Sequence, residues 1–226
     1  MTSLVTQAFE AIGADVDVET QGRVFEIDVR QDGDREAFQL RYPWSGTIEC
    51  DVLDVKPNLR HLVLDVSPAG RTVSARYLCG HDERHWFVAS LPTDDPRSRT
   101  VRGAMEALKP DIVRREQKQK GVKHRRNRRK TAAYVRQGEW FFLPRPMMHV
   151  GELAVPNGTL RRNGGKPHRV DWIYQPKGRD EVFVRGEVSH PDHATLQLQV
   201  WHRVVQNNEV EPAPAARPFT RMTYLD

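Results

Sequence analysis

Hydrophobic positions near the N-terminus recur with the period of an α-helix. They are Leu4, Val5, Ala8, Phe9 and Ile12. Apolar residues three and four positions apart line one side of a helix, and glycine is frequent just after a helix end. Since Gly13 follows the last of these positions, the pattern predicts a helix over residues 3–13.

From residue 16 onward, polar and apolar positions alternate, which is typical of half-buried β-strands. The strands expected in this half are 24–30, 37–43, 47–55, 61–67, 72–78 and 85–91. The turn-forming residues 31–34, QDGD, separate the first two and predict a hairpin. The N-terminal half is therefore expected to be a helix followed by an antiparallel meander.

Residues 101–109 have the pattern of a second short helix, which Pro110 ends. Another helical segment is expected to begin near Asp111. Strand-like patterns then resume, at 134–144, 169–175, 181–188, 194–206 and 219–225. Short strands at nearly regular spacing indicate a small barrel or sandwich. The fold class predicted is α+β, mainly antiparallel β.

Charge divides the chain more sharply than its net value of +5 suggests. Residues 1–112 hold 13 Lys and Arg against 19 Asp and Glu, whereas residues 113–226 hold 22 against 11. Ten of the seventeen residues in 114–130 are Lys or Arg. We therefore expect an acidic α+β domain at 1–110, a basic linker at 111–132 and a basic β domain at 133–226, the linker being a solvated helix or a disordered arm.

The bulk composition excludes some classes of protein. No apolar run approaches the ~20 residues that cross a bilayer, and the N-terminal residues lack the pattern of a secretory signal. Two cysteines do not make a disulfide framework. These features predict a cytoplasmic protein without a membrane partner.

A concentrated positive field next to an acidic module indicates a polyanionic partner, most simply nucleic acid. Lys and Arg neutralise backbone phosphates, and exposed aromatic rings stack on unpaired bases. The residues predicted to contact nucleic acid are Lys123, Arg125, Arg126, Arg128, Arg129, Lys130, Arg161, Arg162, Lys166 and Trp140. Other aromatic residues, including Trp172, are either further stacking platforms or core residues. RNA is favoured over DNA.

Three histidines of the C-terminal half lie at expected strand boundaries. They are His168, within GGKPH, and His190 and His193, within SHPDH. Histidine supplies acid–base groups near neutral pH and neutral ligands for metals, and Asp192 or Asp171 could orient an imidazole. The candidate catalytic site is therefore His168, His190 and His193, with or without a divalent metal. The alternative is three polar surface residues.

A second group, Cys79, His81 and His85, has the residue types of a zinc site, and Cys50 could supply a fourth ligand. The spacing matches no standard zinc finger, however. Cys79 follows Tyr77 and Leu78, which is also the pattern of a buried thiol.

Three blocks of the sequence, LCGHDERHWFVASLP (78–92), RQGEWFFLPRP (136–146) and RGEVSHPDHATLQLQVWHRVVQNNE (185–209), resemble segments of an uncharacterised bacterial family of hypothetical proteins. The resemblance implies a bacterial or phage origin and a separate C-terminal module. It implies no activity, cofactor or catalytic residue.

The leading functional prediction is a nucleic-acid-binding protein, in a ribonucleoprotein or defence complex. One alternative is a His-dependent phosphodiesterase or other hydrolase that uses the C-terminal histidines. Another is an adaptor whose acidic N-terminal domain binds a protein partner.

Overall fold

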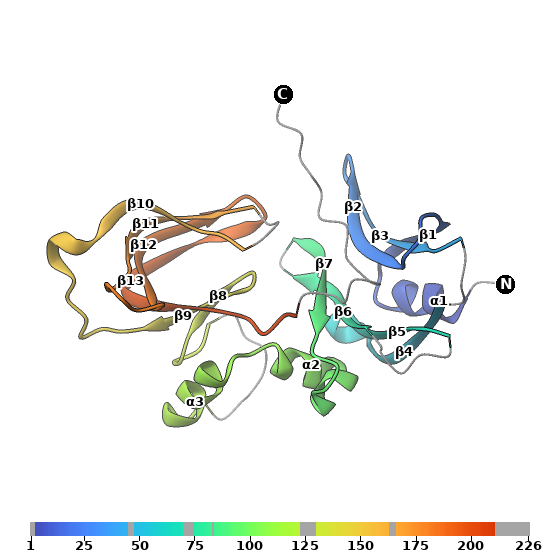
Figure 1. Cartoon of the computed structure of the whole chain (residues 1–226), viewed down its shortest axis with the longest axis horizontal. Coiled ribbons are helices and arrows are strands. Elements are labelled where there is room, and N and C mark those ends of the chain that lie inside the picture. Colours follow the sequence, from blue (N-terminus) through green and yellow to red (C-terminus); the bar gives the residue numbers. More distant parts are fainter. Residues whose placement is uncertain are drawn as a thin grey trace. The chain divides into compact units, whose positions relative to one another are not determined.

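The computed structural model describes residues 3–44, 48–69, 75–82, 84–122, 130–162 and 166–210. The chain divides into two compact units. The first comprises Met1–Leu108 together with Asn208–Asp226, and the second comprises Lys109–Asn207. Figure 1 labels the elements of both units.

The first unit begins with helix α1 and continues as two sheets. Its elements are α1 (Leu4–Ala11), β1 (Asp15–Thr20), β2 (Glu26–Asp32), β3 (Arg35–Tyr42), β4 (Ile48–Lys56), the 3₁₀ turn η1 (Pro57–Leu59), β5 (His61–Pro68), β6 (Ala75–Asp82), β7 (His85–Leu91), η2 (Pro96–Arg99) and α2 (Val101–Ala107). The β2–β3 hairpin and the antiparallel order β4-β5-β6-β7 confirm the expected meander. Strand β1 has no counterpart among the predicted strands, and it pairs with β3 in parallel.

Both faces of the four-stranded sheet are covered, which explains the continuous apolar run of β5. Leu62 and Leu64 belong to the apolar cluster that includes α1, where the Phe9 and Phe38 rings lie 4.6 Å apart. Val63 points to the opposite face and packs in a second cluster with α2. Alternate residues of a strand face opposite sides of its sheet, so every position of this strand segment is buried.

In its described residues, the second unit has one α-helix and one six-stranded antiparallel sheet. Its elements are α3 (Asp111–Gln119), β8 (Val135–Gln137), β9 (Trp140–Pro144), η3 (Gly151–Leu153), β10 (Val155–Leu160), β11 (His168–Tyr174), β12 (Val182–His190) and β13 (His193–Gln206). The strand order is β10-β11-β12-β13-β9-β8. The sequence predicts a small barrel or sandwich here, and a closed barrel is not formed, because no pairing between the edge strands β10 and β8 occurs in the described part of the chain.

The sheet of the second unit curls strongly, although it stays open. Strands β9 and β11 are three strand spacings apart in the sheet. In a flat sheet, the distance between them would be about 14 Å. The Trp140 ring of β9 nevertheless lies 6.4 Å from the His168 ring of β11. Strand β13 is 14 residues long and shifts register against β12, and such irregularities bend a sheet. The curl brings the β8–β9 turn over the start of β11.

The structure places part of the expected basic linker within the second unit. Val113 of α3 is buried with Tyr134, Phe141 and Leu143 against one face of the sheet. Lys130 bridges to Val135 at the other end of the segment. Residues 123–129 lie outside the described residues, as does the strand expected at 219–225. None of the helices in the described ranges has the length and apolar character to cross a membrane.

Candidate functional site

The register of the second sheet places three histidines in one row. Arg169 of β11 pairs with Ser189 of β12, so His168 lies beside His190, which itself pairs with His193 of β13. Directly opposed residues point to the same face of a sheet with short separations. The three rings therefore stack, with centroids 4.2 Å apart for His168 and His190 and 4.8 Å apart for His190 and His193.

The predicted clustering of these histidines is confirmed. One nitrogen atom from each of His168, His190 and His193 lies within 4.8 Å of the other two. No other group of three potential metal ligands this close occurs among the described residues. Neither catalysis nor metal binding follows from the clustering alone, so both stay predictions.

His168 is buried without any hydrogen bond to its ring. His168 is 1% exposed, and neither Nδ1 nor Nε2 has a hydrogen-bond partner among the described residues. Burial, together with the neighbouring His190 and His193, lowers the pKa of His168 from 6.5 to about 3. The imidazole is therefore neutral at physiological pH, which is the state that binds metals.

The β8–β9 turn lies directly over this row. A Cβ atom at Gly138 would stand 2.8 Å from Nε2 of His193 and 3.6 Å from Nε2 of His168. Gln137 is buried, and its side-chain amide donates hydrogen bonds to the carbonyls of Ala194, at 2.6 Å, and Val188, at 3.4 Å. Gly138 thus allows the close approach of the turn, and Gln137 attaches it to the hairpin that carries two of the histidines.

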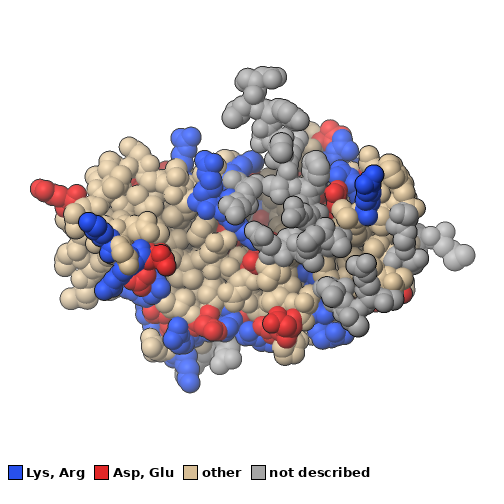
Figure 2. Space-filling model, in the orientation of Figure 1, with Lys and Arg blue, Asp and Glu red and all other residues tan. Residues whose placement is uncertain are grey.

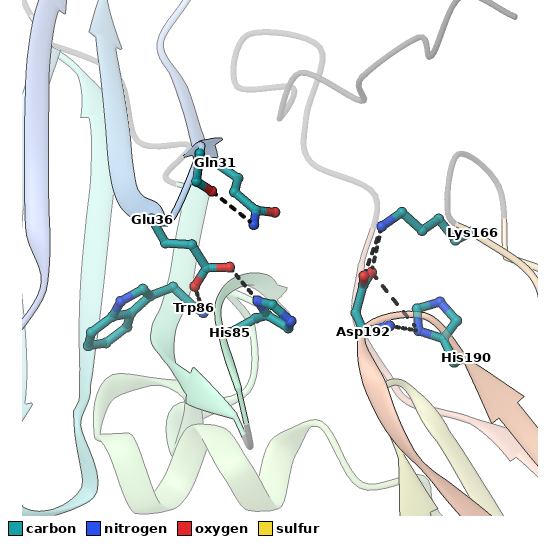
Figure 3. A network of polar contacts seen from close by, with 8 residues as sticks. Gln31, Glu36, His85, Trp86, Lys166, His190 and Asp192 are labelled. Atoms are coloured by element: carbon teal, nitrogen blue, oxygen red, sulfur yellow. Dashed lines mark hydrogen bonds and ion pairs between the residues drawn. The ribbon is translucent and has the colours of Figure 1, made fainter.

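At the tip of this hairpin, Asp192 contacts both His190 and Lys166 (Figure 3). The Asp192 backbone N–H donates to Nδ1 of His190 at 3.2 Å, and Lys166 donates to the Asp192 carboxylate at 2.8 Å. Burial lowers the pKa of His190, and the Asp192 charge opposes that shift. Asp171 instead accepts a hydrogen bond from the backbone of Glu187.

The other proposed metal ligands, Cys79, His81 and His85, are not brought together. Cys79 is buried in the apolar core, where burial raises its thiol pKa well above the ordinary value. His81 packs edge-on against Trp86, at 4.9 Å between ring centroids. In the register of β6 and β7, His85 stands opposite Asp82, whereas Trp86 stands opposite His81. Nδ1 of His85 contacts the Glu36 carboxylate (Figure 3). Strand alternation places Cys79 and His81 on one face of the sheet and His85 on the other.

Cys50, the fourth ligand considered for that group, is half-buried beside Tyr42. Burial raises the pKa of its thiol to about 11. Because the thiolate is the form that binds metals, Cys50 is a poor ligand in this environment.

The residues predicted to contact nucleic acid fall into different environments. Trp140 is only 8% exposed and packs in the core of the second unit, so its ring cannot serve as a platform for a base. Arg161 and Lys166 are exposed beyond the end of β10 and before β11, and Lys130 is exposed too. Lys123, Arg125, Arg126, Arg128 and Arg129 lie outside the described residues.

Cations on α3 differ in whether an acidic group compensates them. Arg114 pairs with Asp111, whereas Arg115 and Lys118 are exposed and have no ion-pair partner in the described ranges. Figure 2 shows both basic and acidic side chains on the face in view.

An aromatic residue that suits base stacking is Trp172 of β11. It is 44% exposed and stands opposite Arg185 of β12 and Pro156 of β10. Arg185 is also exposed. An exposed indole beside an arginine is the combination used to stack on unpaired bases.

Sequence reasoning missed Gln137 and Gly138, because the alternation over residues 134–144 predicts one continuous strand. The signal that points to them is the glycine within RQGEW, since a glycine inside a strand pattern often marks a turn or a close backbone approach. Comparisons with protein families, with characterised proteins and with solved structures find no match to this chain.

Proposed function

We propose that this protein binds nucleic acid through the basic segment 114–130 of its second unit. The observation that carries the proposal is the separation of charge between the units. Residues 109–207 hold 21 Lys and Arg against 9 Asp and Glu, while the remainder of the chain holds 14 against 21. A positive field of this kind attracts a polyphosphate backbone without reading its sequence.

The described end of the basic segment supports this proposal. Helix α3 buries Val113 and Gln117, which fixes the helix to the sheet and turns Arg115 and Lys118 toward solvent. Cations on a rigid helix lose less conformational freedom on binding than cations on a flexible arm. We propose RNA ahead of DNA, since RNA more often presents unpaired bases to an aromatic residue such as Trp172.

The test replaces Arg125, Arg126, Arg128, Arg129 and Lys130 with Gln and measures binding to a single-stranded 20-mer RNA by fluorescence anisotropy across a salt series. Affinity should fall at every salt concentration. The slope of log K against log salt should flatten by about 0.7 for each phosphate that the variant no longer neutralises. The same measurement with single-stranded and double-stranded DNA of that sequence shows which type of nucleic acid binds most tightly.

A matched control removes the same charge from the first unit. Arg23, Arg30, Arg84, Arg99 and Arg102 are exposed there, and their replacement by Gln should leave the slope unchanged. Equal reductions of affinity in the two variants would mean that net charge, not the basic segment, sets the affinity. If the unmodified protein shows no salt-sensitive affinity, the proposal fails and a protein-binding adaptor becomes the better interpretation.

A second candidate function, hydrolysis of phosphodiester bonds, is favoured by the clustering of His168, His190 and His193. Neutral imidazoles near one another can accept a proton from an attacking water and return it to the leaving oxygen. Turnover of an RNA oligonucleotide that disappears in His193→Gln, while RNA binding persists, would support it. Absence of turnover with and without added Zn²⁺ would leave binding as the sole activity.

A further inference from the structure

The two unpartnered nitrogens of His168 require an explanation. A buried polar group without a hydrogen bond costs about 1–3 kcal/mol, and native proteins rarely leave such groups unsatisfied. Here the ring is 1% exposed, and neither nitrogen has a partner in the described chain. Its ring stacks on two further imidazoles rather than bonding to an acid or a backbone carbonyl. A ligand that accepts one nitrogen lone pair from each ring would give one of the two His168 nitrogens its partner.

We infer that His168, His190 and His193 form a binding site for one transition-metal ion, and that Zn²⁺ is the physiological ion this ligand set suits. The inference does not depend on nucleic-acid binding. It rests on three nitrogen ligands within 4.8 Å of one another, on the burial of His168 and on its missing partners.

The ligand chemistry selects the class of ion. Imidazole nitrogen suits Zn²⁺, Cu²⁺ and Ni²⁺, while Mg²⁺ and Ca²⁺ require oxygen ligands. Three protein ligands leave one tetrahedral position open, as in sites where zinc also binds water.

The present ring positions need a small adjustment to hold an ion. Tetrahedral Zn–N bonds of about 2.0–2.1 Å place the nitrogens about 3.3 Å apart, which is closer than the 4.8 Å limit of the present cluster. The rings are also nearly parallel, with interplanar angles of 24° and 28°. An ion would therefore draw them out of the stack and inward. Gly138 places no side chain against the Nε2 atoms of His168 and His193.

Two groups outside the cluster hold its frame. Gln137 joins the β8–β9 turn to the backbone on both sides of the histidine hairpin. Asp192 is held by Lys166, and its carboxylate lies 4.0 Å from Nδ1 of His190, where it can accept a hydrogen bond from Nδ1–H once Nε2 binds the ion. Partners of this kind orient metal ligands, and their removal typically lowers affinity by about 10- to 100-fold.

The experiment is isothermal titration of Zn²⁺ into the full chain, freed of any affinity tag and treated with a chelator. We expect one Zn²⁺ per chain and no heat of binding with Mg²⁺. His168→Gln and His193→Gln should each raise the Kd at least about 100-fold, because direct ligands contribute more than their outer partners. Co²⁺ absorption in the visible range reports tetrahedral nitrogen coordination in the same samples.

The matched control is His149→Gln, which removes an exposed histidine of the same unit and should leave the Kd unchanged. Because His168 is buried, circular dichroism must show that each variant is folded, and the half-exposed His193 provides the variant less prone to unfold. Failure of the unmodified chain to bind Zn²⁺ would overturn the inference. So would binding that both ligand variants retain.

Discussion

His168 combines an imidazole with almost complete burial, so folding of the metal-free protein should be sensitive to acid. The folded-state pKa is about 3, below the ordinary 6.5, because burial and the facing His190 and His193 disfavour a proton more than Asp192 favours it. Below pH 6.5 the unfolded chain therefore binds a proton that the folded chain excludes. The stability that this group contributes is complete above pH 6.5 and is lost as the pH falls toward 3.

We predict that the free energy of unfolding falls between pH 6.5 and 5, by up to about 1.4 kcal/mol per pH unit for this one group. Urea denaturation of the chelator-treated full chain at several pH values measures the slope. His168→Phe should make it shallower, whereas His149→Phe should not. His190 and His202 also have lowered pKa values, so some slope should remain. An unchanged slope in His168→Phe would contradict the prediction.

At the scale of elements, the β8–β9 turn determines the space above the histidine row. Gly138 has a φ of 55°, and its Cβ would meet His193. We predict that Gly138→Ala destabilises the protein in two ways. An alanine in the left-handed backbone conformation costs about 1–2 kcal/mol, and its Cβ collides with the His193 ring. Gly178→Ala has the same kind of strain, with a φ of 72°, but its Cβ meets nothing within 4 Å.

The difference between the two glycine variants therefore isolates the contact with the histidine. Thermal denaturation of both variants measures it, and Gly138→Ala should have the lower Tm. If the two Tm values agree, the turn does not press on His193 in the way described.

Element positions are largely predictable from alternation, because strands such as β5, β7 and β12 follow local polar and apolar patterns. The pairing of β1 with β3 is not predictable in this way, since parallel pairing depends on contacts distant in sequence. The division of 134–144 into two strands is not visible in the alternation, because a glycine turn interrupts the strand locally. The histidine cluster follows from strand boundaries, but the burial of His168 depends on the curl of the whole sheet.

At the scale of the whole molecule, α3 belongs with the second unit rather than acting as a linker. We predict that a fragment of residues 109–207 folds, whereas 133–207 does not, because the shorter fragment uncovers Phe141 and Leu143. Exposing that much apolar surface costs several kcal/mol, at about 25 cal/mol per Å². Circular dichroism and urea denaturation distinguish the two. Cooperative unfolding of the shorter fragment would show that α3 is dispensable.

The return of the chain to the first unit has a consequence for how this protein can be rebuilt. The Asn208 N–H donates to the Leu108 carbonyl at 2.9 Å, and its side-chain amide donates to the carbonyl of Ala107. The points where the chain leaves and re-enters the first unit are therefore adjacent. The intervening residues 109–207 form an insertion with neighbouring ends, an arrangement that tolerates excision or exchange. A short glycine-serine bridge could replace them, and a foreign domain with close termini could be grafted in their place.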